Sequence, residues 1–339
     1  MRHQFMRTPS TTRGFGTKYA NPTTLPTATG KKVAFSPTGN VLAVSTNTSP
    51  YIHAYVWNNG FGPKYANPST AMTDRGSGVA FSPSGNAIAI GQASTSPCIY
   101  AYAWTSGSGF GTKYSNPTTL PSGGVEGVCF SPSGGCLAVA QGNTPYISVY
   151  TWSDATGFGT RYTNPSTIPN GVGWDVAFSP NGNTIAVGFR TAIYAYPWSD
   201  TTGFGTKYAN PASTEPYDHN GIAFSPDGSA IAIAHTQGAA AYAWSSGFTS
   251  RFTDPSSSPG EAYDVSFSPD GGCVAFVSRN TPYLTVYRWS SSGFGGKYSD
   301  PLTIPSGGVF YGVAFSPSSN AIAIATDPSP YISVYPWTS

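Results

Sequence analysis

The sequence is poor in charge. Only 9% of its 339 residues are Asp, Glu, Lys or Arg, and the net charge is +2, whereas an average soluble domain is about 25% charged. Such a balance does not indicate a nucleic acid or an anionic membrane as a partner. No apolar run approaches the ~18 residues of a membrane span, and the first residues, MRHQFMRTPSTTR, lack the apolar segment of a secretion signal. We therefore expect no nucleic-acid binding and no membrane insertion.

Cysteine is scarce, and the spacing of the four cysteines forms neither a disulfide framework nor a zinc motif. Each occupies a position that another residue fills in other copies of an internal repeat: Ala at Cys129, Val or Ala at Cys136 and Cys273, and Tyr at Cys98. We expect free thiols in buried sites, with a disulfide or metal role as the alternative. The catalytic motifs GxSxG and HExxH are also missing. The sequence thus predicts no metal, no cofactor and no catalytic residue.

Glycine, proline and aromatic residues are abundant, and they recur in a repeat. The phrase GFGTKYANP (residues 14–22) returns in similar form at residues 60, 109, 157, 203, 247 and 293. A second phrase, FSP, occurs seven times, at intervals of 46, 49, 48, 46, 43 and 48 residues. A period of this length, rich in β-formers, predicts a propeller with one four-stranded sheet per repeat.

The second copy shows the four expected strands. VAFSP (79–83) is short and apolar, a tight turn follows, and AIAIG (87–91) comes next. IYAYAW (99–104) alternates strictly between small and aromatic side chains, and FGTKYSNP (110–117) completes the set. No segment carries a helical period, so the predicted fold is all-β, with four antiparallel strands in each of seven blades.

The blades resemble WD repeats, as in VAFSPTGNVLAVSTNTSPYIHAYVW (33–57). A Trp ends the third strand of every copy: Trp57, Trp104, Trp152, Trp198, Trp244, Trp289 and Trp337. The Gly-His and Trp-Asp pairs of typical WD repeats are absent, so their hydrogen-bonded tetrad is missing. The Tyr two residues before each Trp is instead expected to pack between blades: Tyr55, Tyr102, Tyr150, Tyr196, Tyr242, Tyr287 and Tyr335.

The first GFG phrase stands ahead of any FSP, which predicts how the ring closes. An open ring would leave strand edges unpaired, so the N-terminal outer strand is expected to pair with ISVYPW (332–337). Residues 14–339 would then form a single propeller, with residues 1–13 as an N-terminal extension. Each outer strand also carries a cation, either to discourage edge-to-edge aggregation, which we favour, or to bind a ligand: Lys18, Lys64, Lys113, Arg161, Lys207, Arg251 and Lys297.

Candidate functional residues are those that break the repeat, and they gather between each outer strand and the next first strand. Seven of the fourteen acidic residues lie there: Asp74, Glu126, Asp175, Glu215, Asp218, Glu261 and Asp264. Aromatic rings next to carboxylates are typical of carbohydrate sites, but Trp174, Tyr263 and Tyr311 could equally plug a central channel. The predicted ligand-binding set is Trp174, Asp175, Tyr263, Asp264, Tyr311, Phe310, His219, Glu126 and Arg190.

The full phrase, as in TPYISVYTWSDATGFGTRYTNPSTIP (144–169), also resembles the repeats of propeller proteins on tailed bacteriophage particles. This resemblance implies a non-enzymatic virion protein on the tail or capsid surface, made in the host cytoplasm. Its loop face would bind a host surface polysaccharide or another virion protein. The alternatives are a cellular lectin-like or scaffold propeller and, with less support, a propeller glycan hydrolase that uses paired carboxylates.

Overall fold

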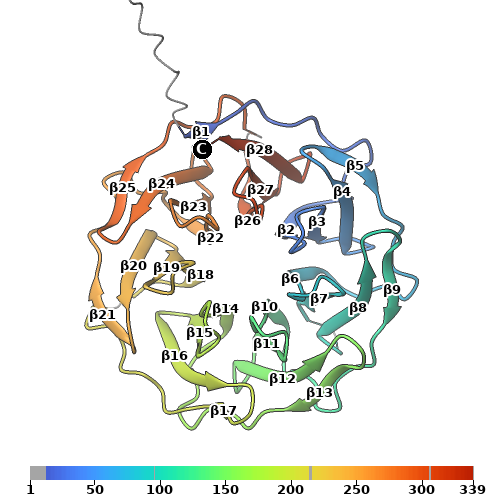
Figure 1. The fold of residues 1–339 in the computed structure, drawn as a ribbon, viewed down its shortest axis with the longest axis vertical. Coiled ribbons are helices and arrows are strands. Elements are labelled where there is room, and N and C mark those ends of the chain that lie inside the picture. The colour runs from blue at the N-terminus through green and yellow to red at the C-terminus, as the bar shows by residue number, and fades with distance from the viewer. Residues whose placement is uncertain (1–12, 95, 214–215, 305–306, 339) are drawn as a thin grey trace, which may run out of the picture.

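The chain forms a ring of seven four-stranded antiparallel sheets around a central opening, as Figure 1 shows. The computed structural model describes residues 13–94, 96–213, 216–304 and 307–338. Blades 1 to 6 are consecutive in sequence, from β2–β5 to β22–β25, and blade 7 combines β26–β28 with β1. The prediction of an all-β, seven-bladed propeller is confirmed.

The two inner strands of each blade surround the opening. The innermost strands are β2 (Gly30–Phe35), β6 (Gly76–Phe81), β10 (Val125–Phe130), β14 (Gly173–Phe178), β18 (His219–Phe224), β22 (Ala262–Phe267) and β26 (Phe310–Phe315). The second strands are β3 (Val41–Thr46), β7 (Ala87–Gln92), β11 (Cys136–Gln141), β15 (Thr184–Phe189), β19 (Ala230–His235), β23 (Cys273–Ser278) and β27 (Ala321–Thr326). Every residue of the second strands is buried, because neighbouring blades cover both faces of the sheet.

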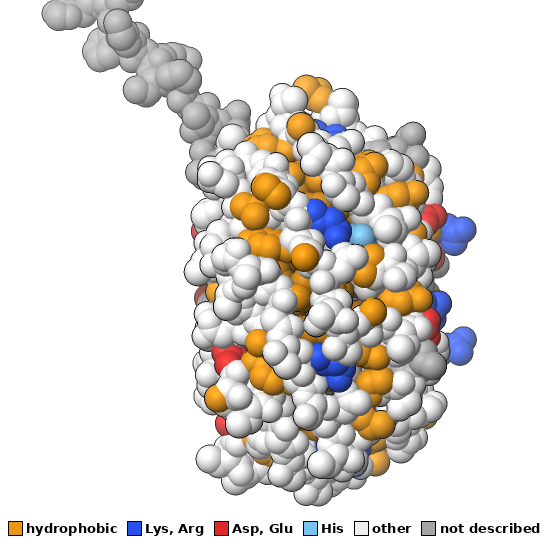
Figure 2. Space-filling model, turned by 90° about the vertical axis from the view of Figure 1, so that its right-hand side faces the viewer, with side chains coloured by type: hydrophobic (Ala, Val, Ile, Leu, Met, Phe, Trp, Pro, Cys, Tyr) orange, Lys and Arg blue, Asp and Glu red, His pale blue; other side chains and the backbone are white. Residues whose placement is uncertain are grey.

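The two outer strands form the circumference. The third strands are β4 (Ile52–Trp57), β8 (Ile99–Thr105), β12 (Ile147–Ser153), β16 (Ala192–Ser199), β20 (Gly238–Trp244), β24 (Leu284–Ser290) and β28 (Ile332–Thr338). The outermost strands are β1 (Gly14–Phe15), β5 (Phe61–Lys64), β9 (Gly109–Lys113), β13 (Gly157–Arg161), β17 (Gly203–Phe204), β21 (Phe248–Arg251) and β25 (Gly293–Lys297). Seen from its edge in Figure 2, this circumference is mostly uncharged, with isolated Lys and Arg side chains.

The two ends of the described chain close blade 7 together. Strand β1 pairs antiparallel with β28, in the register Gly14↔Thr338 and Phe15↔Trp337. Beyond β1, the amide of Tyr19 donates to the carbonyl of Val334 over 3.0 Å. The predicted closure is therefore confirmed. Arg13 forms an ion pair with Asp270 of blade 6, whereas residues 1–12 of the predicted extension lie outside the described residues.

Aromatic side chains join each blade to the next. Tyr55 is fully buried in a cluster that includes Ala323 and Val334 of the preceding blade, and its hydroxyl donates to the Thr24 carbonyl over 2.9 Å. This confirms the predicted packing between blades. A second series, not anticipated from the sequence, sets the aromatic residue after each outermost strand edge-on against the next blade's Trp: Tyr19–Trp57, Tyr65–Trp104, Tyr114–Trp152, Tyr162–Trp198, Tyr208–Trp244, Phe252–Trp289 and Tyr298–Trp337.

Most cations of the outermost strands are held by a side chain three residues further along. Lys207 donates to Asn210 over 2.5 Å, and Lys297 donates to Asp300 over 2.9 Å. Arg161 differs, because it reaches Ser148 on the neighbouring strand. Since these partners belong to the same blade as the cation, the arrangement favours protection of the strand edge over a ligand-binding ring.

The four cysteines are free thiols, as expected. Burial raises the pKa of Cys129 and of Cys273 to about 11. A thiol with a raised pKa is a poor nucleophile at neutral pH, so these residues act as small packing groups.

Candidate functional site

The innermost strands supply the site, because two consecutive residues near the start of these strands line the central channel at two successive levels. At the upper level, one residue from each blade faces the opening: Lys31, Ser77, Glu126, Trp174, Asn220, Tyr263 and Tyr311. Most of the predicted site residues were expected in loops, yet they lie inside strands. The innermost strands begin earlier than the VAF motif suggested. In each blade, the pairing of the innermost strand with the second strand continues, after a register shift, to residues that precede VAF.

The upper level surrounds a pocket of about 410 Å³. This volume is at the lower end of the range of ~300–1,000 Å³ typical of small-molecule sites. Besides the seven side chains named above, the lining includes Lys32, Arg75, Gly76, Asp218, Thr236 and Glu261. Every blade contributes to it, so the pocket lies on the axis of the ring.

The three predicted aromatic residues all reach this pocket, but their environments differ. Tyr263 and Tyr311 pack edge to face, with ring centroids 5.3 Å apart. The ammonium of Lys31 lies over the Tyr311 ring, 3.6 Å from its centroid. The Tyr263 hydroxyl donates to Glu261 over 2.5 Å. Burial together with this hydrogen bond raises the pKa of Tyr263 to about 12. The indole N–H of Trp174 is buried and has no hydrogen-bond partner among the described residues.

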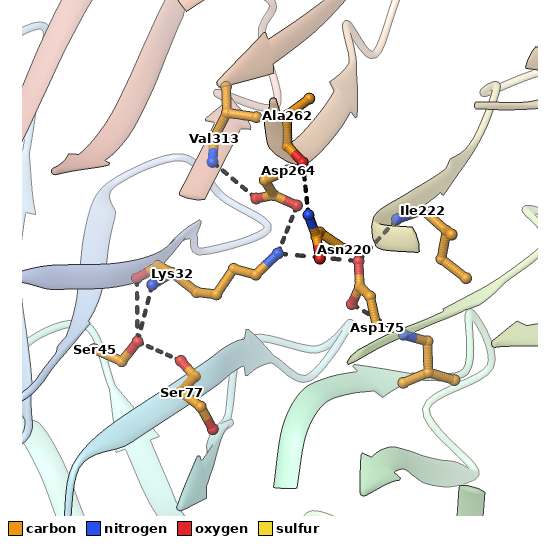
Figure 3. Close-up of polar contacts among 10 residues, drawn as sticks. Lys32, Ser45, Ser77, Asp175, Asn220, Ile222, Ala262, Asp264 and Val313 are labelled. Atoms are coloured by element: carbon orange, nitrogen blue, oxygen red, sulfur yellow. Dashed lines mark hydrogen bonds and ion pairs between the residues drawn. The ribbon is translucent and has the colours of Figure 1, made fainter. Parts of the chain in front are cut away.

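A buried ion cluster forms the lower level, as Figure 3 shows. The ammonium of Lys32 lies 2.6 Å from a carboxylate oxygen of Asp264 and 4.0 Å from one of Asp175. These three residues come from blades 1, 6 and 4. The cluster therefore links three blades across the channel beneath the pocket.

Each carboxylate of the cluster also holds the next blade. Asp175 accepts the amide of Ile222 over 3.0 Å, and Asp264 accepts that of Val313 over 2.9 Å. Burial raises the pKa of Asp175, while Lys32 opposes this shift. Burial lowers the pKa of Lys32, but the two carboxylates more than offset it and leave it above the ordinary value.

Glycines in the other four blades make room for this cluster. A Cβ on Gly127 would lie 2.8 Å from the Cα of Asp175, and Gly221 and Gly312 stand equally close to Asp264 and Lys32. Each larger side chain thus follows a glycine in the preceding blade. Glycine and a larger side chain cannot alternate all the way around a ring with an odd number of blades. The two glycines Gly78 and Gly127 therefore lie next to each other, in blades 2 and 3.

Five predicted site residues do not line the pocket. Asp175 and Asp264 lie in the ion cluster beneath it. Phe310 is fully buried and stacks on Tyr283 at 4.8 Å, and His219 is fully buried next to His235. Both stand at the first position of their strands, one residue before the pocket-lining residues Asn220 and Tyr311. Arg190 is exposed at the rim, where it pairs with Asp218 at 3.5 Å.

Several pocket residues were missing from the predicted ligand set, chiefly Lys31, Lys32, Arg75, Asn220 and Glu261. Their positions within the repeat are the signal that could have found them, because each lies within two residues of a position equivalent to that of Trp174. The predicted Glu126 does line the pocket, whereas Glu215 lies outside the described residues.

Comparison with models of known protein families and with curated protein sequences finds no match. In the part of the chain that the structure describes, no helix is long and apolar enough to cross a membrane. The same residues contain no cluster of three or more His, Cys, Asp or Glu side chains that could hold a metal ion.

Proposed function

We propose that the chain is a non-enzymatic adhesion protein of a bacteriophage particle, and that its axial pocket binds a glycan of the host surface. The observation that carries this proposal is the combination of Trp174 and Tyr263 with carboxylates and amides around one small opening. Aromatic rings stack on the C–H faces of sugars, and carboxylates accept hydrogen bonds from hydroxyl groups.

The buried carboxylates support binding rather than hydrolysis. A retaining or inverting glycosidase needs one carboxylic acid and one carboxylate free to face the scissile bond. Asp175 and Asp264 are instead engaged by Lys32 and by backbone amides beneath the pocket. Nearer the mouth, Glu261 accepts the Tyr263 hydroxyl, and Asp218 pairs with Arg190.

The particle assignment rests on the repeat phrase and on its resemblance to virion propellers. A protein of this kind would be made in the host cytoplasm and displayed on the tail or capsid, bound to other virion proteins. The low charge of the circumference is compatible with such packing, because few ionic groups need to be desolvated when another protein covers it.

A glycan array with wild type and Trp174→Ala tests the binding proposal. Wild type is expected to bind one group of related glycans, and the variant to lose at least about tenfold in affinity, as the loss of a stacking ring implies. Lys113→Gln, on the circumference, is the matched control and should bind as wild type does. Binding that is unchanged in Trp174→Ala, or absent from wild type, contradicts the proposal.

An assay for released reducing ends tests the non-enzyme claim on any polysaccharide that binds. We expect no turnover by wild type, and therefore none to lose in Asp175→Asn or Glu261→Gln. Turnover by wild type that either substitution abolishes would favour the hydrolase instead.

A further inference from the structure

Two cations from adjacent blades stand together at the pocket mouth. Lys31 belongs to β2 of blade 1, and Arg75 directly precedes β6 of blade 2. Both line the pocket. Neither has a carboxylate within ion-pair distance among the described residues, since the ion pairs of the mouth are Arg190–Asp218 and Arg279–Glu261.

The position of Lys31 is fixed and costly. Its ammonium is held over the Tyr311 ring at 3.6 Å. Burial lowers its pKa, and Arg75 is the strongest single charge acting on it, in the same direction, while Glu126 and Asp327 partly offset the effect. Two like charges that lie close together without a carboxylate between them repel each other. An anion bound between them relieves this repulsion, so it is stabilised more strongly there than a neutral group would be.

The rest of the pocket compensates this pair only in part. Glu126 belongs to blade 3, next to the blade that carries Arg75, and it also lines the pocket. Burial raises the pKa of Glu126, although Arg75, Lys31 and Lys32 act in the opposite direction. Asp218 and Glu261 are already paired with arginines at the outer rim. The two faces of the mouth therefore differ, with cations from blades 1 and 2 and aromatic rings from blades 4, 6 and 7.

From this arrangement the geometry points to an acidic sugar as the ligand, with its carboxylate or phosphate between Lys31 and Arg75 and its ring against Trp174. This inference deepens the proposed function and rests on it. Because the face of Tyr311 carries Lys31, Tyr311 is a positioning residue that holds the ammonium rather than a stacking surface for the sugar.

Paired glycans separate the contribution of the anion from that of the sugar ring. The array should hold glucuronate-terminated, phosphate-bearing and matching neutral, carboxyl-reduced oligosaccharides. We expect wild type to bind one class of acidic members at least about tenfold more tightly than the neutral ones, as for the loss of a charge-assisted hydrogen bond. The carboxylate and phosphate arms identify which anion is read.

Variants assign the preference to residues. Arg75→Gln and Lys31→Gln should weaken binding of the acidic members about tenfold and leave the neutral members unchanged. Glu126→Gln removes a competing charge and should tighten acidic binding, which a merely structural role would not do. The three variants should have the same melting temperature as wild type, because the substituted side chains lie at the pocket mouth.

The outcomes distinguish the two proposals. Equal binding of acidic and neutral members, still lost in Trp174→Ala, overturns the acidic-sugar inference and retains the glycan site. An acidic preference that survives Arg75→Gln and Lys31→Gln also overturns it. No binding to any member rejects both the inference and the proposed function.

Discussion

Tyr19 packs edge-on against Trp57, with ring centroids 5.1 Å apart and ring planes at 86°. Tyr19 follows the outermost strand of blade 7, and Trp57 ends the third strand of blade 1. The chain runs continuously from Tyr19 to Trp57, and the two ends of the ring meet instead within blade 7, where β1 pairs with β28. The geometry of this contact matches the other six Tyr–Trp or Phe–Trp contacts, so blade 7, although it is built from both ends of the chain, packs on the next blade as the other blades do.

Deleting residues 1–22 is expected to destabilise the propeller, because it removes β1 and the contacts of Phe15 and Tyr19. Phe15 alone lies 4.9 Å from the Trp337 ring, and Phe15→Ala is expected to cost about 1–3 kcal/mol. Deletion of residues 1–12 is the matched control, since it keeps all of these contacts. Equal melting temperatures for the two deletions would show that the closing strand contributes nothing.

Replacing Trp174, Tyr263 and Tyr311 together by Ala tests whether these rings bind or plug. All three are only half-buried at the mouth, so we expect a loss of stability below about 1 kcal/mol and a loss of glycan binding. Thermal melting and a binding titration on the same samples provide the two readouts. A large drop in melting temperature with binding retained would identify a plug.

Lys32→Met is expected to lower the free energy of unfolding by about 3 kcal/mol, because it leaves two buried carboxylates without their cation. The loss should be smaller at pH 5 than at pH 8, since protonation relieves the repulsion between Asp175 and Asp264. Urea denaturation at both pH values measures it. The double variant Lys32→Met/Asp264→Asn should recover part of the loss, and a failure to recover any would mean that the ion cluster is not the cause.

Two buried histidines predict loss of stability in acid. Burial lowers the pKa values of His53 and His235 from 6.5 to about 4. Nearby groups act in the same direction: Lys64 on His53, and His219 and Arg251 on His235. The unfolded chain then binds protons first, so stability falls as the pH drops from 6.5 through 4, by up to about 3 kcal/mol per histidine.

Comparing wild type with His53→Gln and His235→Gln at each pH isolates this effect. The comparison is needed because the raised pKa of Asp175 acts in the opposite direction, favouring the folded state as the pH falls below about 6. Denaturation curves at pH 7 and pH 4 should show a smaller pH dependence in both variants. An identical pH dependence in all three proteins would contradict the assignment.

Much of the fold could be predicted from the sequence because seven copies report the same pattern independently. The four strands, the closing pair and the buried Tyr of the third strand all follow from alternation and from the offset of the first GFG phrase. The contacts between the aromatic residue after each outermost strand and the Trp of the next blade, such as Tyr19–Trp57, could not be predicted. They join segments whose distance from each other depends on how the blades pack.

The site was harder to predict because the boundary of the innermost strand was placed too late. Starting that strand at VAF made Phe310 and His219 loop residues, whereas alternation along the extended strand buries both. The same error hid the role of Lys32, which occupies the position of Asp175 and Asp264 in another blade. One Lys among two Asp and four Gly at equivalent positions was the signal of an ion cluster.

The central claim is that this propeller is an adhesion protein displayed on a virus particle, and its location tests that claim most directly. Particles purified from the source culture would be labelled with a gold-tagged antibody against this chain and viewed by electron microscopy. The account predicts label on the outside of tailed particles, at the tail or over the capsid. Particles that carry no label, while the culture contains the protein, would contradict it.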